Sequence, residues 1–344
     1  MNDIEIAVVI VTYKSAELVI KCLASIYSER EGHDHRGWRR YEGRPPRSPA
    51  QNLKISVVLV DNASGDLPQI RQVVERNGWS SWVTLMLAPK NGGFAYGVNL
   101  GIRCAYARRC PNYVFLLNPD TQVRPGAIAM LVEFLENHPQ VGIAGSSLET
   151  ADGKVWPYAY RFPTLLSEIE HGMQLGIITS CLSHWTVART MNSIAQPTDW
   201  VCGASMMIRP AVLTAIGCLD ENFFLYFEET EFCHRARRAG FSTWYVPESR
   251  VMHGRSTNVD TCLPQRFPGY WFDSRMRYYA TTHSIGTAAL IDVVAIFSSL
   301  LGLLKNKLLR RPSTPHYIRD LLAHSVLLRK NRGFAPPNFY FPPG

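Results

Sequence analysis

The chain has 344 residues, of which 46% are apolar and 19% are charged. This composition can bury a full core in one large domain, or one domain with an appendage, and it excludes a mainly disordered protein. The formal net charge is +8, and the basic residues concentrate at 36–47 and in the C-terminal third. Such clusters suit phosphates, anionic lipid or nucleic acid. Nucleic acid is the weakest of these partners because no zinc-finger, RNP or helix-turn-helix signature accompanies the charge.

Eight cysteines are spread along the chain without a CxxC pair, several of them inside apolar runs. We therefore expect reduced cysteines in the core. The acidic start from Asn2 to Glu5 runs directly into a strand-like segment and lacks the basic region of a secretory signal. A cytosolic location is expected for the main domain.

The first part of the chain alternates strand-like and helix-like segments. Short β-branched runs at 7–11 and 56–60 are typical of strands covered on both faces, and residues 16–27 between them show helical spacing. The alternation continues with a helix near 67–77, a strand at 83–87, a helix near 95–107, a strand at 113–117 and a helix at 125–136. This order predicts an α/β protein with a doubly wound sheet, which binds ligands beyond the carboxyl ends of its strands.

Two segments depart from this alternation of strands and helices. Residues 29–52 are rich in Pro, Gly and Arg and are too long for an ordinary loop, so we expect an insertion or a lid there. After residue 145 the regularity weakens, and the stretch from Trp156 to Ala204 suits an acceptor-binding half.

Residues 285–304 form a nearly apolar segment that is followed by Lys305, Lys307, Arg310 and Arg311. Its length reaches the lower range for a membrane span, but Asp292 and several small polar residues interrupt it. We expect a helix lying in the membrane interface, with its basic flank (285–311 in all) held by anionic lipid. A buried or oligomer-forming helix is the alternative.

The most informative segment is 223–235, where Glu228, Glu229 and Glu231 follow an aromatic run. Carboxylates placed this close in an apolar frame raise at least one pKa, which turns an acid into a general base. The alternative is a solvated acidic helix start, because Glu in a first turn complements the helix dipole. The aromatic run before Glu228 argues against a fully solvated position. For Glu231 we expect a role in capping and supporting a helix that runs to Gly240.

Each of the first four strands is followed by a polar cluster. An Asp after the second strand can accept the ring N–H of uracil or thymine, Tyr13 can stack on a base, and paired glycines let the backbone approach a ligand. Each cluster alone is ordinary turn chemistry. The absence of GxGxxG and of GxxxxGK[ST] argues against a dinucleotide dehydrogenase and a P-loop NTPase. The clusters are Thr12-Tyr13-Lys14-Ser15, Asp61-Asn62-Ala63-Ser64, Pro89-Lys90-Asn91-Gly92-Gly93-Phe94 and Asn118-Pro119-Asp120-Thr121.

Taken together, these motifs resemble the family 2 glycosyltransferases, which are inverting enzymes of GT-A fold. The resemblance covers residues 6–256 and rests on the order TYKS, VDNASGD, NGGFAYGVN, LNPDT, FFLYFEETEFCHRARRAG and VMHG. The chain looks most like the bacterial rhamnosyltransferase-type branch that builds cell-surface polysaccharide such as O-antigen. The resemblance implies sugar transfer from a dTDP- or UDP-sugar to a hydroxyl, often of a lipid-linked glycan, by a peripheral protein on the cytoplasmic face of the membrane. The expected donor is dTDP-rhamnose, which supplies L-rhamnose.

The same resemblance implies a domain division and a donor site. Residues 1–256 would be the GT-A domain, with a nucleotide half at 1–145 and an acceptor half at 146–256, and residues 257–344 would be a helical extension. The residues expected to hold the donor nucleotide are Thr12, Tyr13, Asp61, Asn62, Lys90, Asn91, Gly92, Gly93, Phe94 and Asn118.

For the metal, Asp120 matches the last acid of the family's DxD motif, while Asn118 replaces the first acid. His253 matches a late His that joins the metal or the diphosphate in some relatives. An amide is a poorer cation ligand than a carboxylate, so we expect weak binding of Mg²⁺ or Mn²⁺, completed by the donor diphosphate and water.

For catalysis, the resemblance makes Glu229 the general base, with Glu228 orienting the acceptor or tuning the pKa of Glu229. Trp200, Gly203 and Ala204 match the segment that lines the acceptor side. Three alternatives stay open: a UDP-hexose donor, a catalytically silent scaffolding subunit, which Asn118 and the insertion would suit, and a nucleic-acid-binding module centred on residues 36–47.

Overall fold

A computed structural model describes residues 3–31, 53–155, 159–173, 175–189, 193–254, 266–310 and 315–328. Several expectations lie outside these ranges. They concern most of the 29–52 insertion, the basic cluster at 36–47, and Trp156, Pro157, Cys262, Arg311, Arg329, Lys330 and Arg332.

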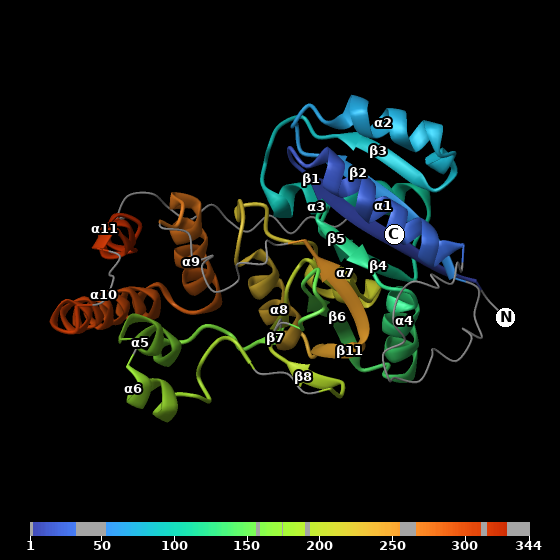
Figure 1. Ribbon diagram of the computed structural model, residues 1–344. Helices are drawn as coiled ribbons and strands as arrows, with labels where there is room; N and C mark the ends of the chain where they lie inside the picture. The colour runs from blue at the N-terminus through green and yellow to red at the C-terminus, as the bar shows by residue number, and fades with distance from the viewer. Residues whose placement is uncertain are drawn as a thin grey trace.

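A single mixed sheet forms the centre of the protein, in the order β3-β2-β1-β4-β10-β6-β11-β5, with β8 pairing to β11 (Figure 1). Strands β1 to β4 run parallel, and β10 lies antiparallel between β4 and β6. A smaller sheet pairs β7 with β9. The strands are β1 (Ile4–Thr12), β2 (Leu53–Asp61), β3 (Val83–Leu87), β4 (Tyr113–Leu117), β5 (Thr121–Val123), β6 (Val141–Glu149), β7 (Ala159–Tyr160), β8 (Gln196–Thr198), β9 (Trp200–Val201), β10 (Ser205–Ile208) and β11 (Ser242–His253).

Helices cover both faces of the large sheet. Alternate residues of β1 enter opposite cores: Ile6, Val8 and Ile10 pack with α1, α2 and α4, whereas Val9 and Val11 pack with α3, α7 and α8. The helices are α1 (Ala16–Arg30), α2 (Leu67–Arg76), α3 (Phe94–Arg108), α4 (Ala127–Asn137), α5 (Leu165–Met173), α6 (Gly176–Cys181), α7 (Pro210–Ile216), α8 (Glu228–Arg238), α9 (Gly269–Thr282), α10 (Ile285–Leu308) and α11 (Pro315–Ala323), with a short 3₁₀ helix at Trp79–Ser81. The predicted α/β architecture and the order of the eight predicted elements are confirmed, whereas the short strand β5 before α4 and the 3₁₀ helix before β3 were not predicted.

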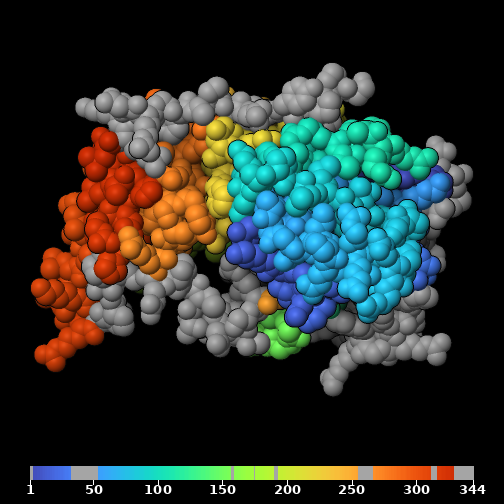
Figure 2. Space-filling model, turned by 90° about the horizontal axis from the view of Figure 1, so that it is seen from above, coloured from blue at the N-terminus to red at the C-terminus, as the bar shows by residue number. Residues whose placement is uncertain are grey.

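The helices α9, α10 and α11 lie at the end of the molecule away from β1, β2 and β3 (Figures 1 and 2). Helix α10 packs along α5, so the segment 165–173 shares a layer with the C-terminal helices. The helix expected at 285–304 is present and extends to Leu308. Within the described ranges, α10 is the one helix whose length and composition would let it cross a membrane.

The expectation for the cysteines is only partly right. All seven cysteines in the described ranges are free thiols, and Cys22, Cys218 and Cys233 are buried. Cys110 and Cys181, in contrast, are exposed, so their predicted place in the core is wrong. Cys110 follows the end of α3 and Cys181 ends the short helix α6, and neither residue belongs to the two cores that cover the faces of the sheet.

Candidate active site

The polar clusters after β1, β2 and β3 contact one another. The side-chain amide of Asn62 donates to Asn91 Oδ1 and to the carbonyl oxygen of Gly93, each at 3.0 Å. The Asn62 backbone N–H donates to the carbonyl oxygen of Thr12 at 2.9 Å. Because the carboxyl ends of these parallel strands share one sheet edge, three clusters far apart in the sequence form one surface.

The loop after β3 also meets the acidic motif. The Phe94 backbone N–H donates to the carbonyl oxygen of Phe224 at 2.7 Å. Gly93 has φ +90°, and a Cβ atom there would lie 2.1 Å from the same Phe224 oxygen. Position 93 therefore requires glycine, both for its backbone conformation and for the close approach of the 224–227 loop.

The expected nucleotide-binding side chains differ in accessibility. Tyr13 is 46% exposed and Lys90 is also exposed. Asp61 is fully buried, and its carboxylate accepts hydrogen bonds from the Ser64 N–H (2.9 Å), the Ser64 hydroxyl (2.6 Å) and the Leu67 N–H (3.2 Å). Asp61 thus shapes the turn into α2, and its contact with a base stays a prediction.

The cluster after β4 brings the two expected metal ligands together. Asp120 Oδ1 lies 3.2 Å from His253 Nε2, and the Gly254 N–H donates to the carbonyl oxygen of Asp120 at 2.7 Å. The pairing of β11 with β5, which sets His253 opposite Thr121, creates this proximity. A carboxylate and an imidazole are a donor pair that Mn²⁺ accepts, so these residues fit a divalent cation. The described ranges contain no group of three or more His, Cys, Asp or Glu side chains placed to hold a metal ion.

The backbone before α8 is held in an unusual conformation. Tyr226 and Phe227 have φ of 72° and 66°, the left-handed region that non-glycine residues rarely adopt. Such residues cost about 1–3 kcal/mol each and persist where surrounding contacts fix them. Here the Phe94 N–H holds Phe224, and the Ser274 hydroxyl of α9 donates to the carbonyl oxygen of Leu225 at 3.0 Å. These contacts fix the point at which Glu228 and Glu229 enter the site.

Glu228 and Glu229 occupy different environments. Glu228 is 2% exposed, whereas Glu229 is half-buried. Each has one carboxylate oxygen without a hydrogen-bond partner among the described residues. Burial, together with the nearby Glu229 charge, raises the pKa of Glu228 well above its usual value. Burial also raises the pKa of Glu229, and a hydrogen bond from the Gly203 backbone opposes that rise.

Gly203 lies between Glu229 and Phe94, which follows the loop after β3. A Cβ atom at this position would lie 3.1 Å from the Phe94 ring and 3.9 Å from Glu229 Oε1. The next residue, Ala204, is fully buried and accepts the Asn118 N–H with its carbonyl oxygen at 3.2 Å. Segment 203–204 therefore lies between the acids and the cluster after β4.

Trp200 is placed differently from Gly203. Its ring stacks on Tyr160 with centroids 4.2 Å apart, and its indole N–H donates to the carbonyl oxygen of Arg161 at 2.9 Å. These contacts give the side chain a packing role in the pairing of β7 with β9. An additional acceptor contact stays a prediction.

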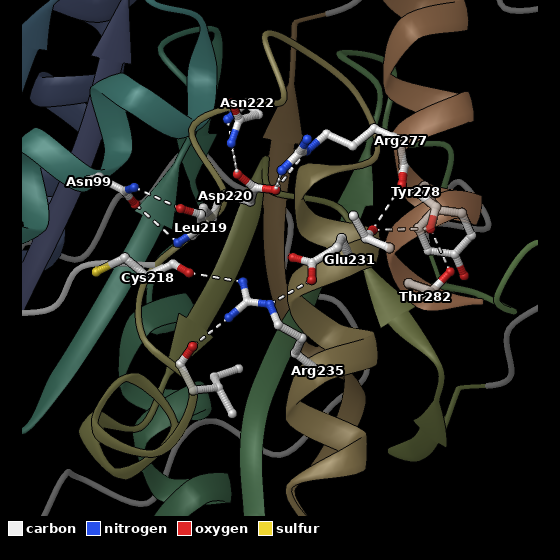
Figure 3. A network of polar contacts seen from close by, with 12 residues as sticks. Asn99, Cys218, Leu219, Asp220, Asn222, Glu231, Arg235, Arg277, Tyr278 and Thr282 are labelled. Atoms are coloured by element: carbon white, nitrogen blue, oxygen red, sulfur yellow. Dashed lines mark hydrogen bonds and ion pairs between the residues drawn. The ribbon is translucent and has the colours of Figure 1, made fainter. Parts of the chain in front are cut away.

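The structure corrects the role of Glu231. Phe227 occupies the N-cap position of α8, and its side chain makes no capping hydrogen bond. Glu231 is 3% exposed and pairs instead with Arg235 at 2.6 Å, one helical turn later. Arg235 also donates to the carbonyl oxygens of Ile216 and Cys218 (Figure 3). Glu231 therefore supports the helix through Arg235 and does not cap it.

A second buried ion pair, which the sequence motifs did not reveal, lies next to this one. Arg277 of α9 and Asp220 approach to 2.6 Å, and Asp220 also accepts from the Asn222 amide at 2.7 Å (Figure 3). The pair links α9 to the segment before the acidic motif. Asp220 and Arg277 are 57 positions apart, so neither spacing nor local pattern indicates their contact.

The chain is similar to known glycosyltransferases. The model of the family described as "Glycosyltransferase like family 2" matches residues 47–270. The chain is 28% identical to an N-acetylglucosaminyl-diphospho-decaprenol L-rhamnosyltransferase of Mycobacterium tuberculosis over 61% of this chain and 69% of that protein. It is 26% identical to the low-salt glycan biosynthesis hexosyltransferase Agl10 of Haloferax volcanii (65% and 66%) and 23% identical to rhamnosyltransferase WbbL of Escherichia coli (59% and 74%).

Solved structures show the same fold. GalNAc-T7 with UDP, GalNAc and Mn²⁺ superposes with a TM-score of 0.56 at 14% identity, over 96% of this chain and 58% of that chain. Mannosyltransferase PcManGT of Pyrobaculum calidifontis, in complex with GDP-Man and Mn²⁺, gives 0.52 at 16% identity, over 96% and 82%. The fold is therefore GT-A. The chain belongs to the glycosyltransferase-like family 2 and is a glycosyltransferase.

Proposed function

We propose that this glycosyltransferase moves L-rhamnose from dTDP-rhamnose, with inversion, to a hydroxyl of a lipid-linked glycan during cell-surface polysaccharide synthesis. The observation that carries the proposal is the half-buried Glu229 beside Gly203 and Phe94, next to the loops expected to hold the donor. The names of the mycobacterial and E. coli relatives support rhamnose, and the mycobacterial name supports a lipid-linked acceptor.

In this proposal Glu229 is the general base. It removes the proton of the acceptor hydroxyl while that oxygen attacks the anomeric carbon from the side opposite the leaving diphosphate. Glu229 suits the task because one of its oxygens has no hydrogen-bond partner among the described residues and its pKa is raised by burial. The more deeply buried Glu228 keeps its proton to a higher pH, so it orients the acceptor or tunes Glu229 as a neutral acid.

The donor would lie across the joined clusters. Tyr13 stacks on the base, Lys90 meets the diphosphate, and the backbone of Gly92 and Gly93 approaches it closely. Thr12, Asp61, Asn62 and Asn91 shape the floor of this site, Asn118 lies near the diphosphate, and Phe94 closes the side toward Gly203. Trp200 and Ala204 support the acceptor side.

Asp120 and His253 would hold Mg²⁺ or Mn²⁺, and a bound cation would neutralise the charge that develops on the leaving diphosphate. Their 3.2 Å contact supports this assignment. The donor set contains one carboxylate because Asn118 replaces the other acid. Diphosphate oxygens would therefore supply a large share of the coordination.

A UDP-hexose donor is the second candidate, which the name of the Haloferax hexosyltransferase favours. A silent scaffolding subunit is the third, and the intact Glu228, Glu229 and Asp120 argue against it.

The expected location is the cytoplasmic face of the membrane, where lipid-linked acceptors and nucleotide sugars meet.

The test is thermal stabilisation of the full chain by dTDP-rhamnose, UDP-glucose, UDP-galactose, UDP-N-acetylglucosamine and GDP-mannose, each with Mg²⁺, Mn²⁺ or chelator. A ligand that binds only the folded state raises the melting temperature according to its concentration and Kd. Selective, metal-dependent stabilisation by dTDP-rhamnose is expected. A UDP-sugar response would favour the second candidate, and no response would favour the silent subunit.

A further inference from the structure

One face of α10 carries an uninterrupted apolar stripe. Its residues recur every three or four positions, which places them on one side of a helix. Their exposed fractions run from 49% to 76%, unusually high for a row of large apolar side chains on a protein surface. The stripe consists of Leu290, Val293, Phe297, Leu300, Leu304 and Leu308.

The opposite face of α10 is fixed to the protein by buried polar contacts. Asp292 is 1% exposed and pairs with Arg275 of α9 at 2.7 Å, and Arg275 also meets Glu168 of α5 at 2.9 Å. The Val326 N–H donates to the other Asp292 oxygen at 2.9 Å. Pulling α10 into a bilayer as a span would strip Asp292 from these partners, which is strongly unfavourable.

Close backbone contact reinforces this attachment. A Cβ atom at Gly302 would lie 2.2 Å from the carbonyl oxygen of Gly172, and one at Gly172 would lie 2.2 Å from Ser298 Oγ. Helices α5 and α10 thus pack at a distance that only glycine permits at these two positions. The stripe is therefore the outer face of a folded helix layer at one end of the molecule (Figure 1).

The charges around the stripe indicate which kind of partner binds it. Asp292 is the one acidic residue of α10, and it is buried, whereas Lys307 and Arg310 are exposed at the C-terminal end of the stripe. A second copy of this face would bring no carboxylate from α10 to these cations. An anionic lipid surface offers both phosphates for the cations and an acyl boundary for the apolar side chains.

We propose that the exposed stripe of α10 docks the protein on an anionic membrane surface, with the helix parallel to the bilayer and its inner face still packed on α5 and α9. The docking is linked to catalysis, because α9 holds the 224–227 loop through Ser274 and Asp220 through Arg277. The stripe would thereby set the orientation of Glu229 to lipid-linked acceptors. This inference deepens the proposed function and rests on it for the acceptor.

The test is co-sedimentation of the full chain with vesicles of phosphatidylcholine alone and of phosphatidylcholine mixed with phosphatidylglycerol. We expect stronger binding to the mixed vesicles. The double substitution Phe297→Glu/Leu300→Glu should lower partitioning into them by about 100-fold or more, because apolar burial is lost and charge is added. Lys307→Glu/Arg310→Glu should lower it by about tenfold or more while leaving the weaker binding to pure phosphatidylcholine unchanged.

Ile194→Glu is the matched control, since Ile194 is 65% exposed against 63% for Phe297 but lies outside the stripe. It should bind vesicles as the natural chain does, and thermal unfolding should show that all variants fold. Unchanged partitioning of the Phe297→Glu/Leu300→Glu variant would overturn the proposal. So would a dimer of the natural chain that this variant converts to a monomer, or retention in vesicles after alkaline carbonate extraction, which marks a span.

Donor-induced thermal stabilisation, measured on the same variants in the absence of vesicles, separates the two proposals. Vesicle binding without a donor response would contradict the proposed function alone. A donor response without vesicle binding would contradict the docking surface alone.

Discussion

The backbone of Gly203 hydrogen-bonds to the carboxyl group of Glu229 and leaves one Glu229 oxygen without a partner among the described residues. A Cβ atom at position 203 would lie 3.1 Å from the Phe94 ring and 3.9 Å from Glu229 Oε1, so Gly203 lies close to both side chains. In the proposed reaction, this contact with Gly203 would orient one carboxylate oxygen, and the acceptor hydroxyl would have to reach the other, which is buried.

We therefore predict that Glu229→Gln keeps donor binding and lowers kcat by about 10²–10⁴-fold, the usual contribution of a general base. Glutamine keeps the shape and can still accept the Gly203 N–H, but it cannot take a proton. Rates with saturating donor and donor-induced thermal shifts would be measured together. Near-normal turnover would rule out Glu229 as the base.

Glu228→Gln should stabilise the fold at neutral and alkaline pH. The raised pKa means that the folded state binds a proton more tightly than the unfolded chain, whose Glu pKa is about 4.3. The free energy of unfolding therefore falls as pH rises from about 4.3 toward the raised pKa, and at higher pH the buried carboxylate destabilises the fold. Glutamine removes that charge.

The melting temperature of Glu228→Gln should exceed that of the natural chain by about 2 °C or more at slightly alkaline pH, and the gain should shrink below about pH 4. Calorimetry across pH measures it. Glu229→Gln is the comparison, with a smaller gain expected because Glu229 is less buried. A Glu228→Gln variant that is less stable at alkaline pH would contradict the inferred titration.

The strands that carry this site, and the polar clusters at their ends, were predictable because they depend on local sequence patterns. The β-branched runs predicted β1 and β2, and the polar clusters after the strands predicted one shared site, in which the structure shows Asn62 in contact with Asn91. The side-chain partners of Glu231 and Asp61 were not predictable in the same way. Nothing local reveals that Arg235 will pair with Glu231, or that Ser64 and Leu67 will satisfy Asp61.

Long-range contacts were the least predictable part. The left-handed Tyr226 and Phe227 carry no glycine or asparagine signal, and their conformation depends on Phe94 and Ser274, which lie far away in the sequence. Likewise, the sequence showed an acid inside an apolar helix but not its partner Arg275. These features arise from tertiary packing, which overrides local preference.

Gly93→Ala should weaken both the fold and donor binding. The backbone of residue 93, with φ 90° and ψ −178°, costs an L-residue about 1–3 kcal/mol, and the steric overlap with the Phe224 carbonyl adds about 1–3 kcal/mol. Gly240→Ala is a matched control, because Gly240 has the same φ of +90° but no atom within 4 Å of the added Cβ. Denaturant unfolding should show the larger loss for Gly93→Ala, together with a reduced donor-induced thermal shift. Equal losses in the two variants would show that the contact with Phe224 carries no energy.

Asn118→Asp should strengthen metal binding by restoring a second acid near Asp120. Cation affinity rises with the number of charged ligands, so we expect Mn²⁺ to bind the protein–nucleotide complex about tenfold tighter or more. Asp120→Asn should abolish the metal dependence of donor binding, and chelator should then have no effect on it. Titration of Mn²⁺ followed by electron paramagnetic resonance measures the affinity directly. Asp152→Asn, at a carboxylate 51% exposed, is the control and should bind Mn²⁺ as the natural chain does. Unchanged affinity in both Asn118→Asp and Asp120→Asn would place the cation elsewhere.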